Sequence, residues 1–202
     1  MGSSPITGAV EGDLDGVVLE RIVRHVGREP GPVYGRKGKL QLLTSLGGYN
    51  NAARFAPWLV LIDLDRDCDC PPPCRKQWLP EPAPLMCFRI AVRAVEAWLL
   101  ADRERIAGFL GLSAKRVPTD PDRLSDPKAT LIELAKGSRR GAIRQGLVPR
   151  PESGRRIGPE YNALLSQFVS DQEQGWRPDV AACESDSLQR CLARLGELRQ
   201  QL

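Results

Sequence analysis

The chain has 202 residues, of which 42% are hydrophobic and 27% charged, and its formal net charge is +4. This is the composition of an ordinary soluble globular protein, and the length suits one α/β domain with an appended portion. No apolar run approaches the roughly 18 residues of a membrane span, and the N-terminal residues lack the pattern of a secretory signal. We therefore expect a cytoplasmic protein that makes no use of a membrane.

The first half of the chain alternates strands with helices. Strands are predicted at residues 4–10, 31–35, 57–65 and 85–92. Helices are predicted at residues 11–27, at 37–56 with an interruption at Gly47-Gly48, and at 94–111. The third strand is apolar on both faces, which is typical of a central strand in a parallel sheet. This order predicts a mostly parallel sheet flanked by helices on both faces.

The second half of the chain changes character and is predicted to be helical. A connector rich in proline and aspartate leads to helices predicted at residues 125–138, 158–171 and 185–202. Ser125 or Asp126 is expected to cap the first of these helices, with Pro127 in its first turn. We therefore predict an α/β core over residues 1–112 and a helical C-terminal portion over residues 113–202, packed on that core.

Acidic residues follow two of the predicted strands. Glu11 ends the first strand, and Asp63 and Asp65 end the third. Ligands of open α/β sheets bind beyond the carboxyl ends of the strands, and residues i and i+2 of an extended chain project to the same side. Three converging carboxylates repel one another without a cation, and Mg²⁺ or Mn²⁺ prefers such oxygen ligands. The pattern predicts a metal site, although Asp-x-Asp by itself also caps helices.

These motifs resemble a known family of domains. A strand followed by Glu-Gly with an aspartate close behind, and then a strand ending in Asp-x-Asp, is the pattern of Toprim domains, carried here by "VEGDLDGVVLERI" and "LVLIDLDRD". Toprim domains occur in topoisomerases, primases, ribosomal-RNA maturases and overcoming-lysogenization-defect (OLD) nucleases. The stretch "RIAVRAVEAWLLAD" further resembles a bacterial family of Toprim-like proteins, some of them in phage-defence loci, and this likeness extends through "DPKATLIELA" and "GPEYNALLSQF".

The resemblance implies a Toprim-like (Rossmann-like) fold and a Mg²⁺-dependent nuclease or related phosphodiester-cleaving enzyme. Glu11, Asp63 and Asp65 would then hold the metal and serve catalysis, while water attacks the phosphate in line. Asp67 is a candidate fourth acid. Glu96 is a further candidate ligand, or alternatively the partner of Arg93 in an ion pair.

Basic residues are the candidates for holding a phosphate backbone. Lys128, in the part of the chain that resembles the narrower family, is a candidate for neutralising the charge of the scissile phosphate. Candidates for nucleic-acid binding are Lys37, Lys39, Arg139, Arg140 and Arg144. Each of these side chains has the alternative of lying on an ordinary solvated surface.

Cysteines form a separate cluster just after the Asp-x-Asp motif. Cys68, Cys70 and Cys74 have the spacing C-x-C-x₃-C, which could supply three thiolates to zinc. Structural zinc sites commonly use paired knuckles with four ligands, so a reduced, proline-stiffened loop is the favoured expectation.

Two other functions compete with the nuclease. A strand ending in Asp-x-Asp also opens haloacid-dehalogenase-type phosphatases, and sugar-nucleotide transferases use Asp-x-Asp to hold a metal. The other alternative is a non-catalytic subunit that binds nucleic acid or an ATPase. The sequence has no G-x₄-GK[ST] motif, so an ATPase partner would be a separate protein.

Overall fold

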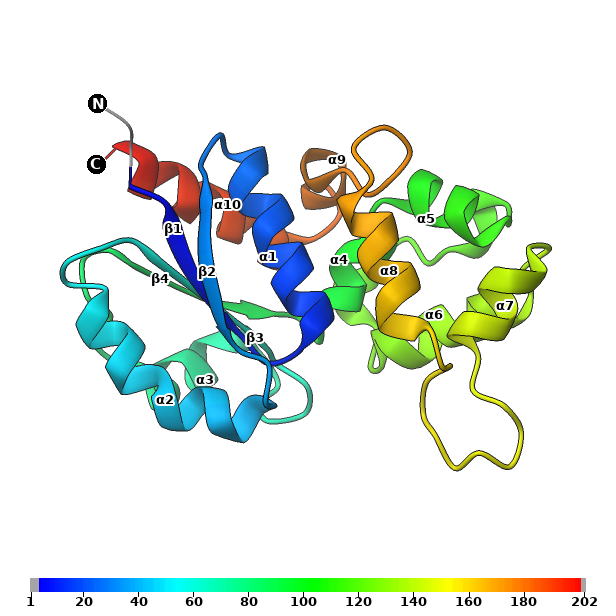
Figure 1. Cartoon of the computed structure of the whole chain (residues 1–202), viewed down its shortest axis with the longest axis horizontal. Helices are drawn as coiled ribbons and strands as arrows, with labels where there is room; N and C mark the ends of the chain where they lie inside the picture. The colour runs from blue at the N-terminus through cyan, green and yellow to red at the C-terminus, as the bar shows by residue number, and fades with distance from the viewer. Residues whose placement is uncertain (1–3, 201–202) are drawn as a thin grey trace.

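A four-stranded parallel sheet forms the centre of the computed structural model, which describes residues 4–200 (Figure 1). The strands are β1 (Ile6–Val10), β2 (Pro30–Gly35), β3 (Trp58–Asp63) and β4 (Met86–Ala91). They are ordered β2-β1-β3-β4, and every neighbouring pair is parallel. The predicted α/β class with a parallel sheet is therefore confirmed.

Helices cover both faces of this sheet (Figure 1). The helices α2 (Lys39–Ala52) and α3 (Pro71–Trp78) cover one face, and α1 (Asp13–His25) and the last helix, α10 (Asp186–Gln200), cover the other. The side chains of β3 point alternately to the two faces, which explains this arrangement. Val60 and Ile62 belong to the apolar cluster under α2, whereas Leu59 and Leu61 belong to the cluster shared with α1.

Two predicted helices in the first half differ from the structure. Helix α2 runs through Gly47-Gly48 without a break. The predicted helix at 94–111 is divided into α4 (Val95–Ala101) and α5 (Arg103–Leu110) by Asp102, which is fully buried and caps α5. The Oδ1 atom of Asp102 lies 2.7 Å from Nη2 of Arg177, so a long-range ion pair fixes the break.

The C-terminal portion is helical, as predicted. It contains two short 3₁₀ turns and five helices, namely η1 (Ala114–Arg116), η2 (Pro121–Arg123), α6 (Pro127–Lys136), α7 (Gly141–Leu147), α8 (Tyr161–Ser170), α9 (Pro178–Ala182) and α10. Asp126 caps α6 through a 2.8 Å hydrogen bond that its side chain accepts from the amide of Ala129. The helices α7 and α9 are too short to have a clear apolar period in the sequence.

The two portions share one hydrophobic core. Its largest cluster extends from Ile6 in β1 to Leu198 in α10, and α8 packs directly against α1. Buried aromatic residues join the portions: the indole of Trp176 donates a 2.9 Å hydrogen bond to the carbonyl of Trp98. Helices α6, α7 and α8 lie beyond the carboxyl end of the sheet, whereas α10 lies on one of its faces (Figure 1). None of the described helices is long and apolar enough to cross a membrane.

Candidate functional site

Four carboxyl groups gather at the carboxyl end of the sheet. Glu11 directly follows β1, Asp63 ends β3, Asp15 lies in the first turn of α1 and Glu96 lies in the first turn of α4. We call these residues the inner carboxyls. The charges of Glu11, Asp15 and Glu96 all raise the pKa of Asp63, which places these three side chains close to it. The sequence predicted Glu11, Asp63 and Glu96 here, but not Asp15.

Backbone amides fix one oxygen of three inner carboxyls. The Oε1 atom of Glu11 accepts a 2.8 Å hydrogen bond from the amide of Asp63. The Oδ1 atom of Asp63 accepts one of 3.0 Å from the amide of Val95, at the start of α4. The Oδ2 atom of Asp15 accepts one of 2.7 Å from the amide of Gly12. These bonds join β1, β3 and the starts of α1 and α4 into one preorganised edge.

The electrostatics of the inner carboxyls show an excess of negative charge. Burial raises the pKa of Glu11 to about 7, in spite of its hydrogen bond from Asp63 and the charge of Lys39. Burial and the charge of Glu96 raise the pKa of Asp15 to about 6. Burial, followed by the charges of its acidic neighbours, raises the pKa of Asp63 well above its ordinary range. The cationic and amide partners therefore compensate this cluster only in part.

Glu96 is the most deeply buried member, being 1% exposed. Its Oε1 atom accepts a 3.0 Å hydrogen bond from the hydroxyl of Tyr161 and lies 3.4 Å from Nζ of Lys128. Its Oε2 atom is buried and has no hydrogen-bond partner among the described residues. An unpaired carboxylate oxygen is costly in a protein interior, so Glu96 is an open position for a cation. The alternative pairing of Glu96 with Arg93 is wrong.

Lys128 extends from the first turn of α6 toward these acids. Burial alone would lower its pKa, but the charges of Glu96 and Asp63 outweigh burial and raise it. Arg93 has a different role, because its guanidinium donates hydrogen bonds of 3.0 Å and 2.8 Å to the carbonyls of Asp65 and Cys68. Arg93 thereby holds the loop that follows β3 in place.

The second aspartate of the Asp-x-Asp motif lies outside the inner group. Asp65 and Asp67 form ion pairs of 2.6 Å and 2.7 Å with Nζ of Lys39, and we call these two aspartates the outer pair. The strand ends at Asp63, and Asp65 has a left-handed backbone with φ of 49°. The expectation that residues 63 and 65 project together as in an extended chain is therefore wrong. Asp65 still contributes charge to Asp63 from the rim.

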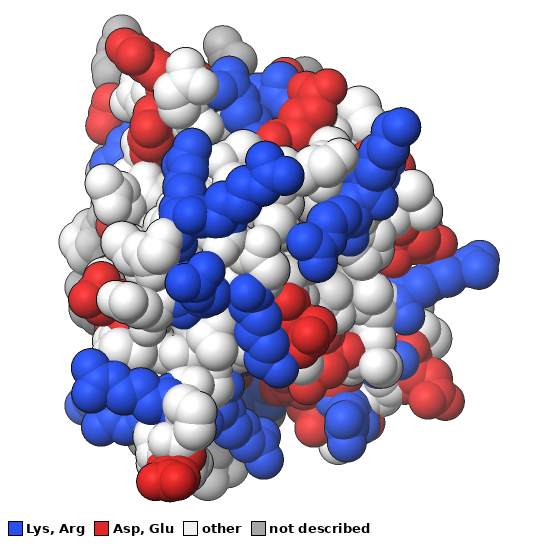
Figure 2. All heavy atoms as spheres, turned by 90° about the vertical axis from the view of Figure 1, so that its right-hand side faces the viewer, with Lys and Arg blue, Asp and Glu red and all other residues white. Residues whose placement is uncertain are grey.

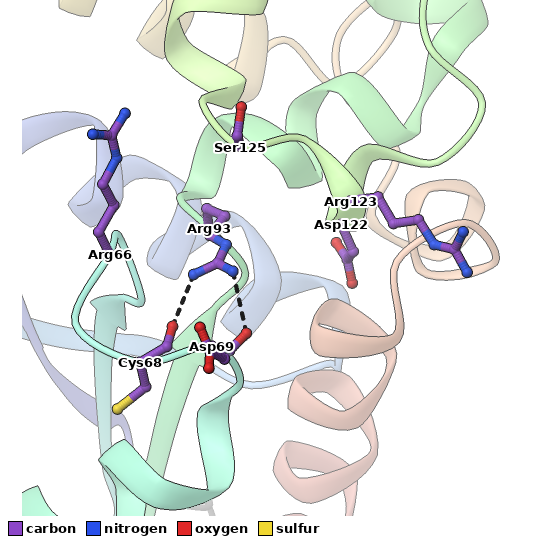
Figure 3. A pocket seen from close by; sticks show the side chains of 7 residues that line it. All are labelled: Arg66, Cys68, Asp69, Arg93, Asp122, Arg123 and Ser125. Carbon is purple, nitrogen blue, oxygen red and sulfur yellow. Dashed lines mark hydrogen bonds between the residues drawn. The ribbon is translucent and has the colours of Figure 1, made fainter.

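A cleft of about 810 Å³ opens beside the inner carboxyls, between the loop that follows β3 and the start of α6. Its lining includes both members of the outer pair together with Lys128, Lys136 and Arg156. An adjoining cavity of about 560 Å³ shares Arg66, Arg93 and Ser125 with this cleft. Figure 3 shows Arg93 in the middle of that cavity, bound to the loop carbonyls, with Ser125 above it.

Most of the predicted nucleic-acid contacts lie apart from the cleft. Lys37 is exposed, and Lys39 is engaged by the outer pair. Arg139, Arg140 and Arg144 lie exposed around the start of α7 and do not line the cleft. Figure 2 shows the face on which these C-terminal helices lie, where Lys and Arg side chains are spread widely with acidic side chains among them.

Cys68 and Cys74 are joined by a disulfide, in contrast to the expected reduced loop. The three prolines before Cys74 open helix α3 instead of stiffening a loop, because proline is favourable in a first helical turn. This helix turns Cys74 back toward Cys68 and buries it, with a Cα–Cα distance of 6.0 Å. Cys70 remains free and exposed. Because two of the three sulfurs are bonded to each other, these cysteines do not form a zinc site in this structure.

The inner carboxyls fit a hard divalent cation in their chemistry. Their donors are oxygens, their negative charge is incompletely compensated, and Oε2 of Glu96 is buried without a partner in the described structure. Over the described residues, no three His, Cys, Asp or Glu side chains are already arranged to hold a metal ion. The side chains of Glu11, Asp15 and Asp63 are instead held by hydrogen bonds from backbone amides.

Asp15 and Tyr161 are the site residues that the sequence analysis missed. Asp15 has the ordinary structural role of accepting a hydrogen bond from the amide before its helix, which hides its second role beside Glu96. Its position in the first turn of the helix that follows Glu11 was the available signal. Tyr161 reaches Glu96 because α8 packs against α1, and no local sequence pattern predicts that contact.

No family model, curated protein or solved structure matches this chain. The resemblance to Toprim domains therefore stays a prediction from the motifs.

Proposed function

We propose that this protein is a Mg²⁺- or Mn²⁺-dependent nuclease or related phosphodiester-cleaving enzyme. The observation that carries this proposal is the gathering of four undercompensated carboxyls at the carboxyl end of a parallel sheet, with Lys128 beside them. Such edges are the usual ligand sites of open α/β folds. The resemblance of the Glu-Gly and Asp-x-Asp motifs to Toprim domains supports the same reading.

Each residue has a definite task in this proposal. Glu11, Asp15, Asp63 and Glu96 would hold one or two ions, with Asp65 contributing from the rim. The bound cation would supply charge neutralisation at the phosphate and a more acidic water. Lys128 would place its ammonium against a phosphate oxygen, where negative charge grows during cleavage. Tyr161 would hold Glu96 in place through its hydroxyl.

Nucleic acid is the proposed substrate because basic side chains surround the cleft. Lys128, Lys136 and Arg156 line it, and Arg156 belongs to the loop between α7 and α8, which extends away from the body (Figure 1). That loop also carries Arg150 and Arg155. Cationic side chains beside a cleft hold a phosphate backbone without reading its sequence. An ATPase would act with this chain only as a separate partner.

A cleavage assay tests the proposal. The wild type is incubated with labelled single- and double-stranded DNA and RNA, with Mg²⁺, with Mn²⁺ and with EDTA. We expect cleavage that needs the metal and that falls at least about 100-fold in Glu11→Gln. Glu20→Gln is the matched control, because Glu20 pairs with Arg24 at a distance from the cleft and should be replaceable.

Two outcomes would reject the proposal. One is the absence of cleavage of every substrate by wild type that binds nucleic acid, which would favour a non-catalytic subunit. The other is equal cleavage by wild type and Glu11→Gln. Hydrolysis of small phosphomonoesters alone would instead favour the phosphatase alternative.

A further inference from the structure

A third cavity lies between α3 and α10, where β4 forms the edge of the sheet. Its volume is about 740 Å³, which is within the range of about 300–1,000 Å³ that is typical of small-ligand sites. None of the inner carboxyls lines it. The cavity therefore calls for an explanation of its own.

Basic side chains from three elements line this cavity. Arg75 and Lys76 come from α3, Arg89 from β4 and Arg190 from α10. Arg190 is neutralised by Asp186, whose Oδ2 atom lies 2.8 Å from its Nε atom. In the described structure, the other three cations have no acidic partner within ion-pair distance.

The second acid of the cavity is also engaged. Asp122 accepts a 2.8 Å hydrogen bond from the hydroxyl of Ser185 and one of 3.3 Å from the amide of Ser187, at the start of α10. It therefore serves to anchor α10 and does not pair with the cations. The uncompensated charge of the cavity is positive.

Arg89 is the most telling of these cations. Its Nε atom is buried and has no hydrogen-bond acceptor among the described residues. A buried donor without an acceptor is costly, and a charged one more so. An anionic ligand in the cavity would supply the missing acceptor. The exposed Arg75 and Lys76 would bind the same anion from α3.

Most of the remaining lining is apolar. Leu79, Phe88 and Ile90 contribute one wall, and prolines at the start of α3 contribute to the rim. A ligand that matches both halves has an anionic group joined to a flat apolar body. A phosphate attached to a nucleobase has this chemistry, since bases pack on aromatic and apolar side chains while arginine holds the phosphate.

The cavity is also connected to the candidate active site. Asp122 lines both this cavity and the one that contains Arg93 and Ser125, as Figure 3 shows for the latter. Arg93 and Ser125 in turn line the cleft beside the inner carboxyls. The three hollows are thus linked by shared lining residues.

We propose that the cavity between α3 and α10 binds a nucleoside phosphate. Arg75 and Lys76 hold the phosphate from the α3 side of the edge strand and Arg89 from its α10 side, and the base lies against Leu79 and the exposed Pro72 and Pro80. The nucleotide is either free or part of a strand that continues from the inner carboxyls, and the second source rests on the proposed function.

Binding is measured in EDTA, so that no cleavage takes place. The probes are adenosine monophosphate, by calorimetry, and a fluorescent single-stranded DNA of about twelve nucleotides, by anisotropy at several salt concentrations. The test variant is Arg75→Gln with Lys76→Gln, because both side chains are exposed and the fold should tolerate the change. Arg89→Gln is a second variant, and its folding is checked by circular dichroism. The matched control is Arg54→Gln, an exposed arginine that lines none of the three cavities.

We expect the double variant to bind its probe about tenfold more weakly than the wild type. For the DNA, the slope of log K against log salt should fall by about 1.4, since each lost phosphate contact on a single strand removes about 0.7. Weaker binding of adenosine monophosphate would identify a free nucleotide as the source. An effect on the DNA alone would identify a strand.

Equal binding by wild type and double variant would overturn the inference, as would a wild type that binds neither probe. The proposed function fails separately. Metal-dependent cleavage with unaltered binding by the double variant would reject this inference alone. Binding that depends on Arg75 and Lys76, in a protein that cleaves nothing, would reject the proposed function alone.

Discussion

The inner carboxyls and the outer pair are neighbours with opposite electrostatic states. The outer pair is exposed, and Lys39 lies within 2.7 Å of both aspartates, so its ammonium offsets one of their two charges and solvent screens the other. The inner carboxyls are more deeply buried, and the pKa values of Glu11, Asp15 and Asp63 are raised by burial first and then by the charges of their acidic neighbours. Asp63 and Asp65, two positions apart in one motif, thus lie in different electrostatic environments.

The largest expected effect separates Asp63 from Asp67. If the inner carboxyls bind the catalytic cation, Asp63→Asn should lower metal-dependent cleavage by about 1,000-fold or more, because it removes a charged ligand. Asp67→Asn should lower it by less than about fivefold, because Lys39 still has Asp65 as a partner. Cleavage rates at saturating Mg²⁺ measure both. Equal losses in the two variants would show that the distinction between the groups is wrong.

The next effect concerns stability and pH in the metal-free protein. Glu11 has a pKa of about 7 against an ordinary 4.5, and Asp15 one of about 6 against 3.8, so the folded state binds these protons more tightly than the unfolded state. The free energy of unfolding should therefore fall as the pH rises from about 4 to about 7, by on the order of 3 kcal/mol for each carboxyl. Urea unfolding in EDTA measures this fall.

Mg²⁺ should reverse that fall, because it binds the folded, deprotonated carboxyls. At about 100 times its dissociation constant it should add about 2.7 kcal/mol, and more at pH 8 than at pH 5. Glu11→Gln should flatten the pH dependence, whereas the exposed Glu20→Gln should leave it unchanged. A metal-free stability that rises steadily between pH 5 and pH 7 would contradict the charge excess.

A smaller effect is expected from Tyr161, which supports Glu96 from α8. Tyr161→Phe keeps the ring in the core and removes only the hydroxyl that donates to Oε1 of Glu96. We expect cleavage to fall about tenfold and the apparent affinity for Mg²⁺ to weaken, with a loss of about 1.5 kcal/mol in stability. Tyr49→Phe, which alters a ring stacked on Trp58 under the opposite face, is the control. A loss of stability without any change in Mg²⁺ affinity would assign Tyr161 a structural role alone.

The sequence predicted those parts of the site that depend on local rules. The apolar run of β3 and the rule that ligands bind at strand ends were sufficient to place Glu11 and Asp63 together. The turn after β3 was not predictable in the same way, because Arg93, which follows the neighbouring strand β4, bonds the carbonyl of the left-handed Asp65.

Long-range packing accounts for the other differences between prediction and structure. Tyr161 meets Glu96 only after α8 has packed against α1, and the helix at 94–111 is divided because Arg177 pairs with Asp102 across 75 residues. The disulfide could have been predicted only by recognising that the prolines begin a helix, because this helix turns Cys74 back toward Cys68. Such contacts have no periodic signature in the chain itself.

The smallest effect tests whether the outer pair can be made to resemble the inner group. Lys39→Gln removes the cation shared by Asp65 and Asp67, and it also removes a charge that lowers the pKa of Glu11. We expect a loss of less than about 1 kcal/mol, because the outer pair is exposed, together with an upward shift in the pH range over which stability falls. Lys37→Gln is the control, since that exposed lysine on the same loop is not a cause of the Glu11 shift. If both variants shift the pH range equally, the outer pair and Lys39 are electrostatically independent of the inner carboxyls.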